Sequence, residues 1–187
     1  MTVKDIMLLS ATALGEQDAC LFLEGKAPSN SDYALETVNL LKRCYDMVTD
    51  EIACEFLPLT ASERFTVVNG KIAFSSFKKH PIKIISVCDL KGRKCAYKLI
   101  NDHLSVANGD VVVNYEYRPY LQNESDSALF ADTVIGEYVL THGINAEFCF
   151  ARGRYGESQK WRDKFISGVT GRINKKSNLK ISARSWF

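Results

Sequence analysis

The chain has 187 residues, of which 46% are hydrophobic and 25% charged, and this composition is typical of a folded globular protein. Its apolar runs fall short of the roughly 18 residues needed to span a bilayer, and residues 1–14 lack the basic start and continuous apolar block of a signal peptide. We therefore expect a protein that is cytosolic, or assembled from cytosolic material, with no membrane partner.

Charge is distributed unevenly along the chain. Residues 151–187 contain ten basic and two acidic residues, a net charge of +8, whereas the first 150 residues carry a net charge of −6. A chain with an acidic body and a basic end can attract the body of another copy, or a polyanion. The alternative is that the basic end is simply solvated.

A capped helix is predicted at the N-terminus. Thr2 is a good N-cap residue, Asp5 stands at the reciprocal position of a capping box, and Gly15 follows Leu14 as a C-terminal stop. The connection from Gln17 to Asn30 is polar at its end, and we expect a loop there.

A long amphipathic helix is predicted from Ser31 to Phe56. Its apolar residues recur at steps of three and four, as one buried helical face requires; they include Ala34, Leu35, Val38, Leu41, Tyr45, Val48 and Ile52. Ser31 is the expected N-cap, and Pro58 disfavours continuation beyond residue 56.

Three turn signals predict an antiparallel β-meander of five or six strands over residues 64–118. Each turn is expected to pair the strands that flank it, because a two-residue turn fixes the register of its hairpin. Asn69-Gly70 sets Val67 opposite Ile72 and Phe65 opposite Phe74, Lys91-Gly92 sets Cys88 opposite Cys95, and Asn108-Gly109 sets Val106 opposite Val111 and Leu104 opposite Val113. Ile82 and Ile84 share a face with Tyr97 and Leu99, and the apolar face of the meander is expected to be buried.

Helix is expected to resume near Ser127 and to continue to Arg152, with Gly143 kinking or splitting it. A last helix is predicted from Glu157 to about Val169, stopped by Gly171, before an extended tail. The fold class is therefore α+β: long amphipathic helices packed with an antiparallel β insert, a C-terminal helical pair and an extended basic tail. The expected parts are residues 1–63, 64–119, 120–170 and 171–187.

The tail combines basic and aromatic residues. Arg184, Trp186 and Phe187 are candidates for docking on another chain, because each large aromatic can bury about 150–250 Å². Packing against the same chain and disorder are the alternatives. The remaining basic residues form an arm with electrostatic potential for nucleic acid; they are Arg172, Lys175, Lys176 and Lys180.

No pattern of catalytic residues is evident. Phosphate-loop, dinucleotide-binding, zinc-protease and serine-hydrolase motifs do not occur in the sequence. Two pairs of carboxylates stand one turn apart on the long helix, Asp46 with Asp50 and Glu51 with Glu55, where a solvated helix face is the simpler interpretation. The six cysteines include no CxxC pair and are expected to be buried free thiols, with a Cys88–Cys95 disulfide as the alternative. We expect no enzyme, cofactor or metal.

The order of elements resembles the head–tail connector (adaptor, or neck) proteins of tailed bacteriophages. The residues that carry this resemblance are the opening Thr2-Val3-Lys4-Asp5-Ile6, Ala11 with Leu14-Gly15, Asn39-Leu40-Leu41 in the long helix, and the ending Arg184-Ser185-Trp186.

The resemblance implies a structural virion protein at the neck, assembled in the host cytoplasm into a ring, usually of twelve copies, beneath the portal. Its implied partners are other copies of itself, the portal protein, a tail or head-closure protein, and DNA that passes through the channel without sequence-specific recognition. A tail-completion or baseplate protein is one alternative, and a small nucleic-acid-binding protein that uses the basic arm is another.

Overall fold

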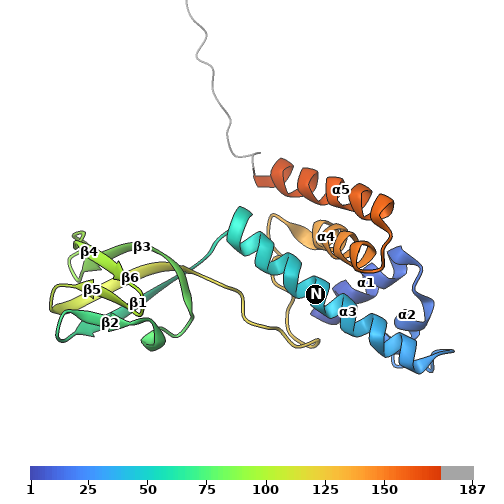
Figure 1. Ribbon diagram of the computed structural model, residues 1–187, viewed down its shortest axis with the longest axis horizontal. Helices are drawn as coiled ribbons and strands as arrows, with labels where there is room; N and C mark the ends of the chain where they lie inside the picture. Colours follow the sequence, from blue (N-terminus) through green and yellow to red (C-terminus); the bar gives the residue numbers. More distant parts are fainter. Residues whose placement is uncertain (174–187) are drawn as a thin grey trace, which may run out of the picture. The chain divides into compact units, whose positions relative to one another are not determined.

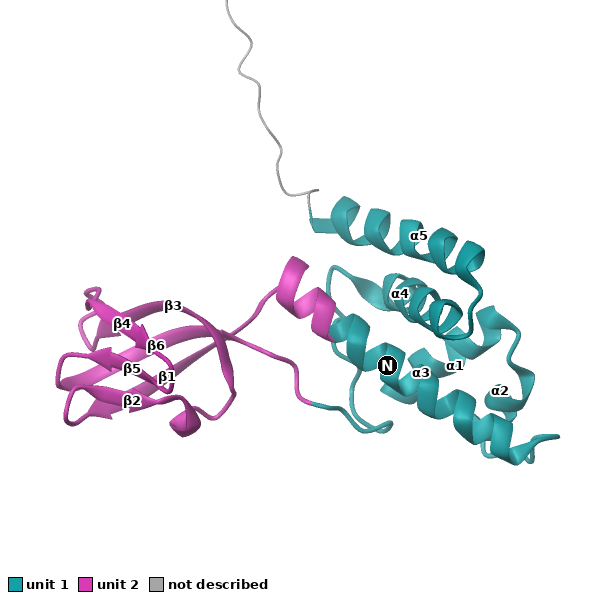
Figure 2. Cartoon of the chain, in the orientation of Figure 1, with its two compact units in different colours: residues 1–49, 121–187 teal, residues 50–120 magenta. Residues whose placement is uncertain are grey.

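The structure, a computed structural model, describes residues 1–173 and has the predicted α+β class. Its helices and strands are labelled in Figure 1. The chain divides into two compact units, coloured separately in Figure 2. A helical unit combines residues 1–49 with the chain from residue 121 onward, and a β unit comprises residues 50–120. The β unit is therefore an insert within the helical one.

Helix α1 (Val3–Leu14) confirms the predicted capping box. The Thr2 hydroxyl accepts a hydrogen bond from the Asp5 backbone N–H at 3.2 Å, and the Asp5 carboxylate accepts one from the Thr2 N–H at 2.8 Å. Gly15 ends the helix at φ +78°, a conformation that favours glycine. These local contacts define both ends of α1.

The predicted loop after Gly15 is wrong in its first half, because α2 (Gln17–Leu23) is a helix. Seven residues are too few to display a helical period, and burial of Ala19 and Leu23 in the tertiary core stabilises it.

Helix α3 (Ser31–Glu51) continues as a short π-helix, η1 (Ile52–Phe56), so the long predicted helix has the predicted bounds but changes its hydrogen bonding at its end. The predicted cap is wrong by one residue: Asn30, not Ser31, accepts the Tyr33 N–H, at 3.0 Å. Asn and Ser are equally good N-caps, so the adjacent pair left the helix start ambiguous.

The helical unit is completed by α4 (Gly136–Ala151) and α5 (Tyr155–Ile173). Helix does not begin near Ser127, as predicted; residues 121–135 instead form an irregular segment in which Phe130 has φ +65°. Buried Tyr45 holds this segment, because its hydroxyl donates to Gln122 and accepts the Leu129 N–H at 2.9 Å. The apolar spacing of this segment therefore reflects burial without helix.

Two glycines allow the helices to pack closely. A Cβ atom on Gly143 would lie 2.8 Å from Val48 Cγ1 and 3.0 Å from Phe165 Cδ2, and one on Gly168 would lie 2.8 Å from Val139 Cγ2. Gly143 thus does not split α4, which runs through it, and Gly171 lies within α5 rather than stopping it.

The β unit contains two three-stranded antiparallel sheets, with strand orders β1-β6-β3 and β2-β5-β4. The strands are β1 (Leu59–Val67), β2 (Lys71–Ala73), β3 (Pro81–Asp89), β4 (Tyr97–Ile100), β5 (His103–Val106) and β6 (Gly109–Tyr117). A short 3-10 helix, η2 (Phe74–Ser76), follows β2. Side chains from both sheets form one core, which includes Val67, Ile72, Val87, Leu104 and Val113.

The predicted hairpin pairings are mostly wrong, although the strands are antiparallel as expected. Val67 pairs with Gly109 rather than Ile72, and Phe65 with Val111 rather than Phe74. Strands β5 and β6 lie in different sheets, so Val106 does not pair with Val111 nor Leu104 with Val113. Cys88 bridges Lys94 rather than Cys95. All six cysteines are free thiols as expected, but only Cys44 and Cys149 are buried and Cys54 is exposed.

Turns are present at Asn69-Gly70 and Lys91-Gly92, whereas the predicted turn at Asn108-Gly109 is wrong because Gly109 already begins β6. Asn69 and Gly70 have φ values of +65° and +70°, and Val68 bridges Lys71 across them. A turn reverses the chain locally, but the two sheets recruit partners from distant sequence positions. Because side-chain alternation has a period of two in either arrangement, the predicted buried face is nevertheless correct at Val67, Leu104, Val106, Val111 and Val113. It is wrong at Ile82, Tyr97 and Leu99, which are exposed beside the open edge of the sheets.

Candidate interaction surfaces

Strands β3 and β4 are edge strands that meet at one end only. Near the Lys91-Gly92 turn the Cys95 N–H donates to the Val87 carbonyl at 2.8 Å, and Cys88 bridges Lys94. Further along, β3 pairs with β6 and β4 with β5, and within residues 1–173 no ladder joins β3 to β4. The two sheets are therefore open along this side.

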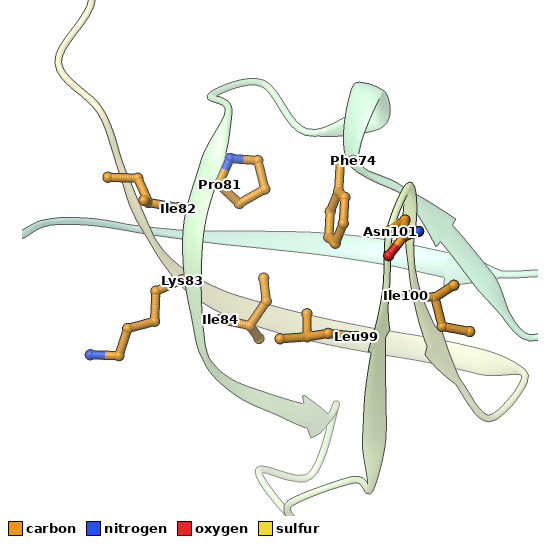
Figure 3. A pocket seen from close by; sticks show the side chains of 8 residues that line it. All are labelled: Phe74, Pro81, Ile82, Lys83, Ile84, Leu99, Ile100 and Asn101. Carbon is orange, nitrogen blue, oxygen red and sulfur yellow. The ribbon is translucent and has the colours of Figure 1, made fainter.

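A cavity of about 300 Å³ lies in the opening between β3 and β4. Ile84 and Leu99 point toward one another from the two strands, and Phe74 lines the same cavity beside them (Figure 3). Pro81, Ile82 and Ile100 complete its apolar wall. Leu99 is 55% exposed and Ile82 46% exposed, so this apolar surface faces solvent.

A backbone carbonyl of β3 faces this opening and already has a side-chain partner. The Ile84 carbonyl is directed toward β4, because the Tyr97 hydroxyl of β4 donates to it at 3.3 Å. Lys83 at the rim pairs with Glu116 at 3.2 Å. The opening thus offers apolar side chains and the hydrogen-bonding edges of two strands, which is the chemistry that an extended peptide segment requires.

The helical unit carries a second apolar surface, over α1, α2, α4 and α5. Two hollows of about 430 and 250 Å³ share Thr12 on α1. The first extends over Gly15, Cys20 and Leu21, and the second is lined by Leu9, Ala13, Tyr138, Thr141, His142 and Trp161. Tyr138 is 65% exposed beside the second hollow.

His142 is the ionisable group of this second hollow. Its ring centre lies 5.5 Å from that of Trp161, and its Nδ1 atom has no hydrogen-bond partner among the described residues. Burial lowers the pKa of His142 below its usual value, and the positive charges of Lys164 and Arg172 lower it further. The hollow therefore presents a neutral imidazole at neutral pH.

Arg154, immediately before α5, and two basic residues of α5 have partners within the helical unit. Arg154 pairs with Glu157, and Arg162 lies 3.7 Å from Glu147. The Arg154 partnership lowers the pKa of the Glu157 carboxyl. Lys164 Nζ lies 4.4 Å from the centre of the Trp161 ring, which favours a cation–π contact.

Of the predicted basic arm, the structure describes Arg172 alone. It lies in α5, and its guanidinium donates to the backbone carbonyl of Ile135. The other candidates lie outside the described residues; they are Lys175, Lys176, Lys180, Arg184, Trp186 and Phe187.

The paired carboxylates of the long helix do not form a site. Asp46 forms an ion pair with Lys42 at 2.6 Å, and Asp50 forms one with Arg118 at 3.5 Å. Within residues 1–173 no group of three or more His, Cys, Asp or Glu residues is arranged to hold a metal ion.

Sequence reasoning missed both apolar surfaces. The signal for the β opening was present in Ile82, Ile84 and Ile85, whose apolar side chains fall on both faces of one strand and cannot all be buried in one core. The hollows on the helical unit had no comparable signal, because they depend on residues from α1, α4 and α5.

Among the helices of residues 1–173, none is both long and apolar enough to cross a membrane. Searches against protein-family models and curated protein sequences found no match to this chain.

Proposed function

We propose that this protein is a structural component of a phage virion, a head–tail connector that forms a homo-oligomeric ring beneath the portal and joins the capsid to the tail around the DNA channel. The proposal starts from the resemblance of the N-terminal helix, the long helix and the Arg184-Ser185-Trp186 ending to that family. In this role the chain acts through contacts with other subunits and the portal.

The observation that carries the proposal is the exposure of apolar surface on both units. In the helical unit, Tyr138 and the two hollows around Thr12 face solvent, and in the β unit Leu99 and Ile82 do so. Grouped apolar surface of this kind marks sites of contact with other proteins. A ring subunit would bury such surfaces against its neighbours and the adjoining neck proteins.

The test uses purified full-length protein, alone and mixed with its portal protein. Light scattering coupled to size-exclusion chromatography gives the mass, and negative-stain images show whether rings form. We expect a closed oligomer that co-elutes with the portal; a monodisperse monomer that does not bind the portal contradicts the proposal.

A tail-completion or baseplate protein would also assemble with itself. It would differ from a connector by binding tail proteins and by not co-eluting with the portal protein. The nucleic-acid-binding alternative uses the basic arm, of which Arg172 already donates to the backbone carbonyl of Ile135 within the helical unit. A salt titration separates it: phosphate binding through the arm requires an affinity for duplex DNA that falls steeply with salt as counterions are released.

A further inference from the structure

The opening between β3 and β4 has the features of a sheet that lacks one strand. It is flanked by β3 and β4, which are edge strands of their sheets, and all four residues of β4 are exposed. An unpaired, apolar edge of this kind is a template for pairing with another extended segment. The segment that fills it must alternate apolar and polar side chains, so that one face enters the cavity and the other meets solvent.

Residues 179–184 have that alternation. Leu179, Ile181 and Ala183 are apolar, and Lys180, Ser182 and Arg184 between them are polar. This stretch lies beyond the described residues, and five residues, 174–178, separate it in sequence from Ile173. The chain therefore carries, in one sequence, both a strand-like segment and an edge that can accept it.

We propose that residues 179–184 of one copy bind as an added strand in the opening between β3 and β4 of a neighbouring copy. The segment pairs in antiparallel fashion with β4, whose ladder with β5 is regular, whereas β3 has irregularities at Pro81/Lys83 and at Ile84/Ser86. Its apolar side chains pack on Phe74, Ile84 and Leu99.

Pairing of this type adds backbone hydrogen bonds as well as buried apolar area, and the alternate side chains give specificity. Because each copy has one donor segment and one acceptor opening, the contact is heterologous and repeats from copy to copy. This inference rests on the proposed function only in requiring that copies be neighbours.

The test is photo-crosslinking in the full-length protein, with Leu99→p-benzoylphenylalanine as the probe. Equal amounts of ordinary and ¹⁵N-labelled protein are mixed, irradiated and digested, and crosslinked peptides are identified by mass spectrometry. We expect mixed-isotope crosslinks that join residue 99 to residues 179–187. The same probe at Ile85, an exposed β3 residue outside the cavity wall, is the control and should not reach this segment.

Two substitutions of equal charge test the strand register. Ile181→Asp should reduce the residue-99 crosslink at least tenfold, because it places a carboxylate in the apolar cavity, whereas Ser182→Asp on the solvent face should change it less than twofold. The inference is overturned by crosslinks within single copies only, by crosslinks to other segments, by none at all, or by equal loss in both variants. The oligomeric mass of the same samples separates the two proposals: a ring without these crosslinks removes this inference alone, and a monomer that ignores the portal removes the proposed function.

Discussion

At the scale of single residues, packing between helices is decided by the absence of side chains as much as by their presence. Gly143 was expected to disturb α4, yet its hydrogen atom faces Val48 and Phe165 at distances that leave no room for a methyl group. Close-packed interiors tolerate added volume poorly, since neighbours must leave their preferred rotamers.

Gly143→Ala is therefore expected to lower the free energy of unfolding by about 1–3 kcal/mol, measured by urea denaturation. Gly156→Ala is the matched control, because no atom lies within 4 Å of its added methyl group. That control should be neutral or stabilising by up to about 1 kcal/mol, as alanine is the better helix former. Equal losses in both variants would contradict the close-packing argument.

His142 gives a second prediction at this scale. Its pKa in the folded protein lies below the ordinary 6.5, because burial and nearby cations disfavour the imidazolium. As the pH falls below 6.5 the unfolded chain takes up the proton first, so the free energy of unfolding decreases until the pH has passed the folded pKa. The contribution of the neutral His142 ring to the free energy of unfolding is thus fully present above pH 6.5 and is lost as the pH falls below that value.

The pH dependence is measured by urea denaturation between pH 7 and 5, and the folded pKa by NMR titration of the His142 ring. His142→Gln should flatten the loss of stability on acidification. A His142 resonance that titrates above 6.5 would contradict the assignment.

At the scale of elements, local rules succeed where an element's ends are determined by its own sequence. The capping box of α1 uses Thr2 and Asp5 within one turn, and it forms as predicted. The strand pairings fail because Val67 pairs with Gly109, a partner far along the chain that no turn motif specifies.

Thr2→Ala is expected to cost about 0.5–2 kcal/mol, because it removes the acceptor for an otherwise unpaired N–H of the first turn. Hydrogen bonds from the Thr2 backbone and side chain lower the pKa of Asp5. The substitution removes the side-chain bond, so the pKa of Asp5 should rise toward its usual value. Thr12→Ala is the control, since the Thr12 hydroxyl donates to the Leu8 carbonyl of its own helix, lies 3.6 Å from Cys20 Sγ and takes no part in capping. Thermal denaturation followed by circular dichroism measures both, and an unchanged midpoint for Thr2→Ala would refute the capping role.

At the scale of the whole molecule, the two units each expose apolar surface beside their cavities. In the proposed ring, the surface of the helical unit around Thr12 and Tyr138 is a contact face between subunits. Burying a tyrosine at such a face stabilises association through its large apolar area.

Tyr138→Glu is expected to weaken self-association at least tenfold, because a carboxylate would be buried at the contact, measured by sedimentation velocity. Tyr120→Glu is the control: Tyr120 is 62% exposed, close to the 65% of Tyr138, but lies outside the hollows. If both variants assemble normally, this face does not join subunits.

The sequence by itself determined the α+β class, the capped first helix, the span of the long helix and most of the buried face of the strands. Those features depend on periodicity and on contacts within a few residues, which a linear reading contains. Tertiary structure alone decided the strand order, the helix at Gln17–Leu23, the close approach at Gly143 and the opening between β3 and β4. Each of these arises where residues distant in sequence compete for the same partners, and the free energy of the whole core settles the outcome.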